Sequence, residues 1–211
     1  MNTQKTLPAY IGVSTVATQS FEHMRVEAYF DGQPSIMFDE PAGFDIGSPP
    51  DLRGQSRGWT PVHAQLAALA SCTAITVTVV ARDQGFRYSG LGTSLTSLID
   101  IRGFFFDLHL RPEYKQLSFD LTLKTQASAA KIRALAAETH RRCPQLGLFD
   151  LARIPMLVRW FRAGESRAVL IERRHMPRGK TPQALLARQA VSKAPRAARK
   201  KTKRNATVKR K

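Results

Sequence analysis

The longest uncharged run of the chain lies between Ala64 and Ala81. Leucine, isoleucine, valine and alanine fall on every face of a helix drawn through it, a threonine–proline pair precedes it and a glycine follows it. These flanking residues are typical helix start and end signals. The pattern predicts a helix over residues 60–85 with no wet face, which is typical of a buried core helix or of a membrane span. Interspersed Ser, Thr and Gln and the lack of an aromatic belt favour the core.

The segments before this helix alternate in a different way. Residues 23–30 alternate apolar and polar positions, residues 35–38 form a second short run, and an Asp-Gly pair lies between them. This is the pattern of a β-hairpin. The first 20 residues are mixed and polar, so we expect a loose lead-in. Residues 39–59 are rich in Gly, Pro and Asp and predict a long loop, and loops of this length are often functional.

Three strand-like segments follow the apolar helix, at residues 91–101, 104–111 and 117–125. The last two are separated by a segment that reads as a turn, RPEYKQ. We expect an antiparallel meander. Two further short apolar runs, at residues 154–162 and 168–172, predict closing strands.

A second helix is predicted over residues 128–143. Its apolar positions recur at helical spacing and share one face: Ile132, Leu135, Ala136, Thr139 and Cys143. Pro144 is expected to end this helix. The mixture of helices and mainly antiparallel strands indicates an α+β fold.

Charge is distributed very unevenly. The chain has 33 Lys and Arg against 16 Asp and Glu, a net charge of +17, but 15 of the basic residues and no acid fall in residues 173–211. The remainder, 33 − 15 = 18 basic against 16 acidic residues, is nearly neutral. We therefore expect a folded domain over residues 1–172 and a disordered Lys/Arg/Ala-rich tail over residues 173–211. Such a tail suits nonspecific binding of nucleic acid.

The chain has only two cysteines, Cys72 in the apolar helix and Cys143 at the end of the second helix. Two are too few for a secreted disulfide framework or a structural zinc site, and we expect no metal and no cofactor. No signal peptide is evident, so a cytoplasmic location is expected. The two thiols are either inert core residues or a redox couple. A couple needs disulfide reach and a cation that lowers the pKa of the attacking thiol.

The residues around these cysteines form recognisable blocks: Pro61, Leu66-Ala67-Ala68, Ser71-Cys72-Thr73-Ala74 and Cys143-Pro144. With the order of elements, they resemble the OsmC/Ohr family of osmotically inducible and organic hydroperoxide resistance proteins. The resemblance implies curved antiparallel sheets wrapped around two long central helices in an intertwined homodimer. It also implies a thiol peroxidase acting on organic hydroperoxides in oxidative stress, with Cys72 as peroxidatic and Cys143 as resolving cysteine. A lipoyl-type dithiol would regenerate the pair.

Two family residues have no counterpart. The family places a Glu directly after the proline, where this chain has Val62, and an Arg in the hairpin loop, where this chain has none. Arg57 or Arg53 in the long loop, or Arg25 on the first strand, could replace that Arg, and His63 could act from the first turn of the helix. The alternative is a non-catalytic OsmC-like binding or dimerisation protein with a nucleic-acid-binding tail.

Overall fold

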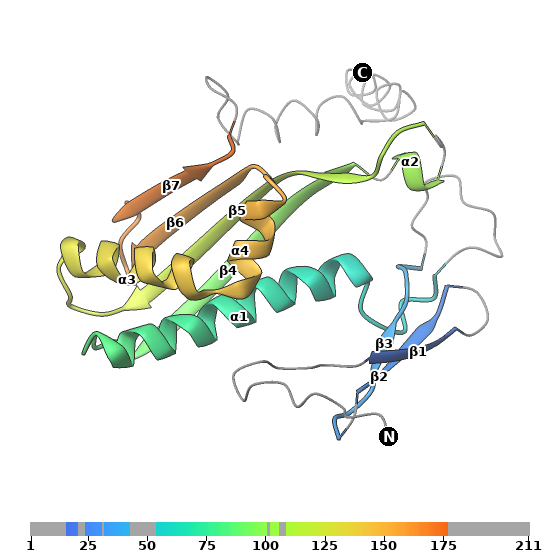
Figure 1. The fold of residues 1–211 in the computed structure, drawn as a ribbon, viewed down its shortest axis with the longest axis horizontal. Coiled ribbons are helices and arrows are strands. Elements are labelled where there is room, and N and C mark those ends of the chain that lie inside the picture. The colour runs from blue at the N-terminus through green and yellow to red at the C-terminus, as the bar shows by residue number, and fades with distance from the viewer. Residues whose placement is uncertain are drawn as a thin grey trace, which may run out of the picture. The chain divides into compact units, whose positions relative to one another are not determined.

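The computed structural model describes residues 16–20, 24–30, 32–42, 54–100, 102–105 and 109–176. The internal contacts of the chain divide it into two units, Met1–Ala67 and Ala68–Lys211 (Figure 1). The predicted α+β fold class is confirmed. The predicted tail lies outside the described residues from position 177 onward.

The first unit contains a three-stranded antiparallel sheet in the order β1-β2-β3. Its strands are β1 (Val16–Ser20), β2 (Val26–Phe30) and β3 (Ile36–Phe38). The predicted hairpin is confirmed as β2 and β3. Gly32 lies in its turn with a φ of 66°, a conformation that glycine adopts without strain.

Strand β1 was not expected, because its residues were predicted to belong to a loose lead-in. It is an edge strand that pairs with β2 from Val16 opposite Phe30 to Ser20 opposite Val26. All five of its side chains are exposed. A strand held by backbone pairing alone leaves no alternation of apolar and polar residues in the sequence, so the prediction was wrong here.

One buried carboxylate, that of Asp39, accepts hydrogen bonds from both described parts of the long loop. Asp39 is only 2% exposed. Its Oδ2 accepts the backbone N–H groups of Gln55 at 3.1 Å and Arg57 at 3.0 Å, and its Oδ1 accepts that of Glu40 at 2.8 Å. These bonds hold both described ends of the loop against each other. Residues 43–53, the middle of the predicted loop, lie outside the described residues.

The long apolar helix is α1 (Pro61–Asp83), which begins in the first unit and ends in the second. The Thr60 hydroxyl accepts the His63 backbone N–H at 3.1 Å and caps the helix. At the other end Gly85 has a φ of 60°, and the Phe86 N–H reaches back to the Ala81 carbonyl at 2.8 Å. Both predicted helix ends are thus confirmed within two residues.

The expectation that α1 has no wet face is wrong for a single chain. One stripe is fully buried, namely Leu69, Thr73, Val77 and Val80. On another face Ile75 is 65% exposed. By length and composition α1 is the one helix of the described residues that could cross a membrane, but the core helix of a soluble protein meets the same criteria. The exposed positions beside Ile75 on this face are uncharged but polar, Ser71 and Thr78.

The second unit contains a four-stranded sheet in the order β4-β5-β6-β7. Its strands are β4 (Gly90–Asp100), β5 (Glu113–Lys124), β6 (Met156–Arg162) and β7 (Leu170–Arg174). The outer pairs are antiparallel, whereas β5 and β6 run parallel. The expected antiparallel arrangement is therefore wrong at the centre of the sheet. Strand β7 ends at Arg174, so it includes the first two residues of the predicted tail.

The predicted strand at residues 104–111 is also wrong. The structure has a four-residue helix there, α2 (Arg102–Phe105), and a turn at residues 109–110. A Cβ atom built on Gly103 would overlap the carbonyl group of Leu110, so the chain folds back on itself at this point. The alternating Phe and Leu residues suggested a strand, but the glycine permits a close backbone approach that a strand does not need. The predicted turn over residues 111–116 is too long, because strand β5 already begins at Glu113.

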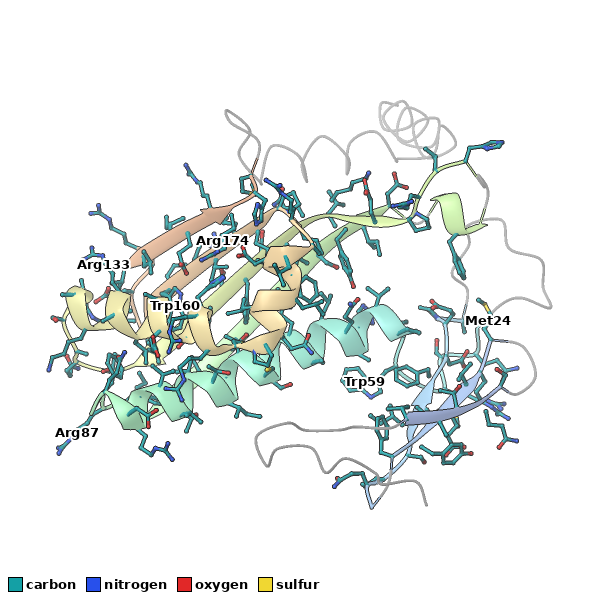
Figure 2. All side chains as sticks on the ribbon, viewed as in Figure 1. Met24, Trp59, Arg87, Arg133, Trp160 and Arg174 are labelled. Carbon is teal, nitrogen blue, oxygen red and sulfur yellow. The ribbon has the colours of Figure 1, made fainter. Side chains whose placement is uncertain are left out.

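Helices α3 (Ala129–Arg142) and α4 (Pro144–Leu151) connect the two parallel strands. The prediction of α3 is confirmed, including its cap, since the Ser128 hydroxyl accepts the Lys131 N–H. Its buried side chains join the inward-facing side chains of β5 and β6 to form the core: Ile132, Leu135, Ala136, Leu117, Phe119, Leu121, Val158 and Trp160. Trp160 is labelled in Figure 2.

Helix α4 was missed. Pro144 was taken only as the end of the preceding helix, but proline is also favoured at the first position of a new one. The residue between the two helices, Cys143, is extended, with φ −79° and ψ 114°. The chain therefore turns sharply at the second cysteine.

Candidate active site

The two thiols lie side by side in the second unit. The Sγ atoms of Cys72, in the middle of α1, and Cys143, between α3 and α4, are 3.6 Å apart. Both are free thiols. A disulfide has a sulfur–sulfur distance of about 2.05 Å, so the two sulfurs need to approach by about 1.5 Å to form one.

The backbone at Cys143 fixes its position. Its N–H donates to the Thr139 carbonyl at 2.9 Å and ends α3, while its own carbonyl accepts the Gly147 N–H at 3.0 Å and begins α4. Cys143 is 2% exposed, whereas Cys72 is partly exposed. Of the two cysteines, Cys72 is therefore the more accessible to solvent.

Two threonines of α1 contact the cysteines: Thr73, which belongs to the family block but was given no role, and Thr76, which was not singled out from the sequence. The Thr73 hydroxyl donates to the Leu69 carbonyl at 2.8 Å and lies 3.6 Å from the Cys143 sulfur. The Thr76 hydroxyl donates to the Cys72 carbonyl at 2.8 Å. Thr76 could have been identified from its position four residues after Cys72, because residues four apart share a helix face. Thr73 directly follows Cys72 in the sequence.

Burial raises the pKa of the Cys72 thiol above its ordinary value. The backbone N–H of Gln145, at the start of α4, and the Thr76 hydroxyl act in the opposite direction, while the neighbouring Cys143 thiol raises the pKa further. The groups of the described residues that lower this pKa are thus neutral. The cation that the sequence analysis required beside Cys72 is not among them.

The other two predicted site residues lie together in the first unit. Arg57 and His63 both line a cavity of about 640 Å³ whose wall includes Met37 and Trp59. Trp59, labelled in Figure 2, is 59% exposed. The cavity therefore combines an apolar surface with a guanidinium and an imidazole.

Glu40 is a further ionisable residue of this region. Burial raises the pKa of its carboxyl, Asp39 raises it further, and His63 opposes both effects. A carboxyl group thus lies within electrostatic reach of the imidazole. Sequence reasoning missed Glu40 because a single acid in a Gly- and Pro-rich loop carries no pattern.

The remaining arginine candidates are separate from this cavity lining. Arg25 lies directly before β2, where it makes a small contribution to lowering the pKa of Glu27 after the hydroxyls of Ser35 and Tyr29. Arg53 lies outside the described residues. Within the described part of the chain, no group of three or more His, Cys, Asp and Glu side chains is arranged to hold a metal ion.

A model of the family described as OsmC-like protein matches residues 54–155, which include Cys72, Cys143, Arg57 and His63. No curated protein matches the chain in sequence.

Solved structures with this fold include an OsmC-like protein from Mycoplasma pneumoniae, 17% identical, with a TM-score of 0.56 over 72% of this chain and 97% of that one. An organic hydroperoxide resistance protein OsmC from Legionella pneumophila is 15% identical, with a TM-score of 0.51 over 72% and 97%. An OsmC-like protein of unknown function from Vibrio cholerae is 10% identical, with a TM-score of 0.55 over 71% and 99%. At these identities the likeness concerns the fold.

Proposed function

Because residues 54–155 match a family model described as OsmC-like protein, we propose that this protein is a cysteine-based thiol peroxidase that reduces organic hydroperoxides in defence against oxidative stress. One observation carries the proposal. A partly exposed thiol, Cys72, lies 3.6 Å from a buried thiol, Cys143, that is 71 residues away in sequence. Two inert core cysteines have no need of such proximity.

The proposed reaction has two steps. The Cys72 thiolate attacks the hydroperoxide, so that a sulfur–oxygen bond forms, the oxygen–oxygen bond breaks and the alcohol leaves after taking up a proton. Cys72 becomes a sulfenic acid. The Cys143 sulfur then attacks the Cys72 sulfur, the disulfide forms and water leaves. One hydroperoxide and two thiols thus give one alcohol, one water molecule and one disulfide.

Regeneration requires an external dithiol, for which we propose a lipoyl-type reductant. One of its thiolates attacks the Cys72 sulfur, the more exposed of the two, and releases Cys143. Its second thiol then displaces Cys72 and leaves as a cyclic disulfide. Such a cycle suits the reducing cytoplasm that the sequence analysis expects.

Attack by Cys72 at neutral pH requires a cation, because its surroundings within the second unit raise its pKa. We assign this role to Arg57, and proton transfer to the leaving alcohol to His63. Both line the 640 Å³ cavity of the first unit, whose apolar wall suits the organic part of a hydroperoxide.

We also propose that the protein is a homodimer. On α1 the Ile75 side chain is 65% exposed in one chain, and on α4 Leu148 is 54% and Leu151 85% exposed. Exposed apolar surface of this kind is covered in most stable folds. A second copy of the chain that packs on these faces would cover it.

The test is a thiol count. Reduced protein is treated with cumene hydroperoxide, and free thiols are counted by mass spectrometry. We expect loss of both thiols in the wild type, no peroxide consumption by Cys72→Ser, and a trappable sulfenic acid in Cys143→Ser. Survival of both wild-type thiols in excess peroxide contradicts the proposal.

A second candidate is a non-catalytic OsmC-like binding protein whose basic tail binds nucleic acid. The raised pKa of Cys72 and the 15 Lys and Arg of residues 173–211 favour it. Inert thiols together with tail-dependent nucleic-acid binding would identify this second function. The two are also compatible, because a basic tail localises an enzyme without altering its chemistry.

A further inference from the structure

A groove of about 1050 Å³ lies in the second unit at the C-terminal end of α1. Its walls are the loop after α1 (residues 84–89), the loop after β5 (residues 124–128) and two residues of α3, Lys131 and Ala134. Neither thiol lines it. The peroxidase proposal therefore leaves this groove without a role.

The groove is preformed by hydrogen bonds between its walls. The Ser89 N–H donates to the Lys124 carbonyl at 2.9 Å, and the Thr125 hydroxyl donates to the Arg87 carbonyl at 2.7 Å. From outside the groove, the Arg162 guanidinium holds the Ala127 carbonyl at 3.1 Å. Ligand sites are usually formed before the ligand arrives, and these bonds provide that rigidity.

The charge of the groove is uncompensated. Three cations line it, Arg87, Lys124 and Lys131, and no carboxylate does. Figure 2 labels Arg87 in the loop that follows α1. Within the part of the chain that the structure describes, none of the three forms an ion pair, although other surface cations of the unit do.

Two acids close in sequence to groove residues or to Arg162 are already engaged. Asp83, next to the groove in sequence, accepts from Arg82 at 2.9 Å and Arg142 at 2.7 Å. Glu165 pairs with Arg162 at 2.9 Å. These carboxylates are therefore not available to neutralise the three groove cations, and an anion from solution is the complementary partner.

The groove also has an aromatic wall. The rings of Phe86 and Tyr88 are 6.5 Å apart and tilted by 47°, and the Tyr88 hydroxyl is held 2.9 Å from that of Thr78. Fixed rings beside three cations suit a ligand that combines a planar apolar part with several anionic oxygens.

We propose that this groove binds an organic phosphate of nucleotide size. Its phosphates contact Arg87, Lys124 and Lys131, and its base lies against Tyr88, beside the largely buried ring of Phe86. The size of the groove matches that of small-molecule sites, about 300–1,000 Å³. An extended nucleic acid would need a longer basic track than one confined groove provides.

The experiment uses the full chain and 8-azido-ATP, with photolabelled peptides identified by mass spectrometry at an ionic strength of about 0.15 M. Peptide mapping separates groove labelling from labelling of the basic residues 177–211. We expect label in peptides of residues 84–89 or 124–134. The double variant Lys124→Gln/Lys131→Gln should reduce it about fivefold or more, the effect of losing two exposed ionic contacts.

The matched control is Arg133→Gln/Arg173→Gln, which removes the same charge from exposed positions outside the groove. It should keep groove labelling within about twofold of the wild type, since distant surface charges are screened. A second pair keeps the test valid if the first variant is unstable. Ala134→Glu places an acid in the groove and should reduce labelling, whereas Ala137→Glu on the same helix should not.

Three results overturn the proposal. They are label confined to residues 177–211, equal loss of label in the groove and control variants, and undiminished label in both groove variants. Labelling does not depend on the thiols, so Cys72→Ser should be labelled as the wild type is. Failure of the peroxidase proposal therefore leaves this result unaffected.

Discussion

The Sγ atom of Cys143 lies 3.6 Å from that of Cys72 because Cys143 both ends α3 and begins α4. The sharp turn between the two helices directs its side chain at the middle of α1. The same turn brings the backbone N–H of Gln145 to the Cys72 thiol. One residue of extended backbone thus determines both the reach of the second thiol and part of the electrostatics of the first.

Replacing Arg57 by Gln should shift the pH dependence of Cys72 oxidation upward. Burial raises the pKa of Cys72, so at a given pH less thiolate is present than for an ordinary thiol. If Arg57 offsets this in the wild type, the variant should react about tenfold more slowly at neutral pH for each unit by which the pKa rises. Its rate should keep increasing as the pH rises through and above the ordinary thiol range. Stopped-flow measurement of sulfenic acid formation tests this.

The matched control for Arg57 is Arg133→Gln, an exposed arginine on α3 in the second unit. Its pH profile should overlay that of the wild type. An Arg57→Gln profile that also overlays the wild type would show that another group activates Cys72.

Replacing Ile75 by Glu should disrupt the proposed dimer. Ile75 is 65% exposed in one chain, so the substitution costs little in a monomer but places a charge in a buried interface. Sedimentation velocity at low micromolar concentration should show a dimer for the wild type and a monomer for the variant. The control Ile171→Glu, on β7 at a side chain that is 51% exposed, should remain dimeric. A folded wild-type monomer contradicts the proposal.

Removing residues 177–211 should abolish most polyanion binding without unfolding the protein. Of the 15 basic residues from position 173 onward, 15 − 2 = 13 lie beyond Arg174, where β7 ends. With about six phosphate contacts, the affinity of the full chain for duplex DNA should fall roughly a thousandfold between about 50 and 200 mM salt. Titrations of both chains at several salt concentrations test this. Equal binding by the shortened chain would place the responsible charge in the folded part.

Replacing Asp39 by Ala should destabilise the first unit by about 2–4 kcal/mol. The substitution leaves three backbone N–H groups, those of Glu40, Gln55 and Arg57, without their charged acceptor. Because Arg57 is one of them, hydroperoxide reduction should fall as well. Urea unfolding and a peroxide assay measure the two effects. Asp39→Asn, which keeps one acceptor oxygen, should lose less stability, and equal losses would argue against hydrogen bonding as the cause.

Short sequence signals were sufficient to predict helix ends and the hairpin, because these features depend on residues within a few positions of one another. The ends of α1 followed from Thr60 and Gly85, and the start of α3 followed from Ser128, because caps act within one turn. The hairpin followed from a two-residue turn. The blocks around the two cysteines suggested the family, and the residues matched by the family model include both cysteines.

Other features depend on partners that are distant in sequence, and only the tertiary structure decided them. Strand β1 is formed by backbone pairing with β2. Gly103 lies in a tight turn of the chain because the Leu110 carbonyl packs directly against it. Strands β5 and β6 pair in parallel because α3 and α4 lie between them in sequence and carry the chain back to the end of the sheet where β5 began.

The same division holds for the sites. That Cys72 and Cys143 are candidates for a redox pair followed from their residue type and their sequence context. Their 3.6 Å separation, the neutral groups that oppose the raised pKa of Cys72, and the gathering of Arg87, Lys124 and Lys131 around one groove arise from long-range packing. Distances and burial are properties of pairs of residues brought together by folding, and no pattern along one segment contains them.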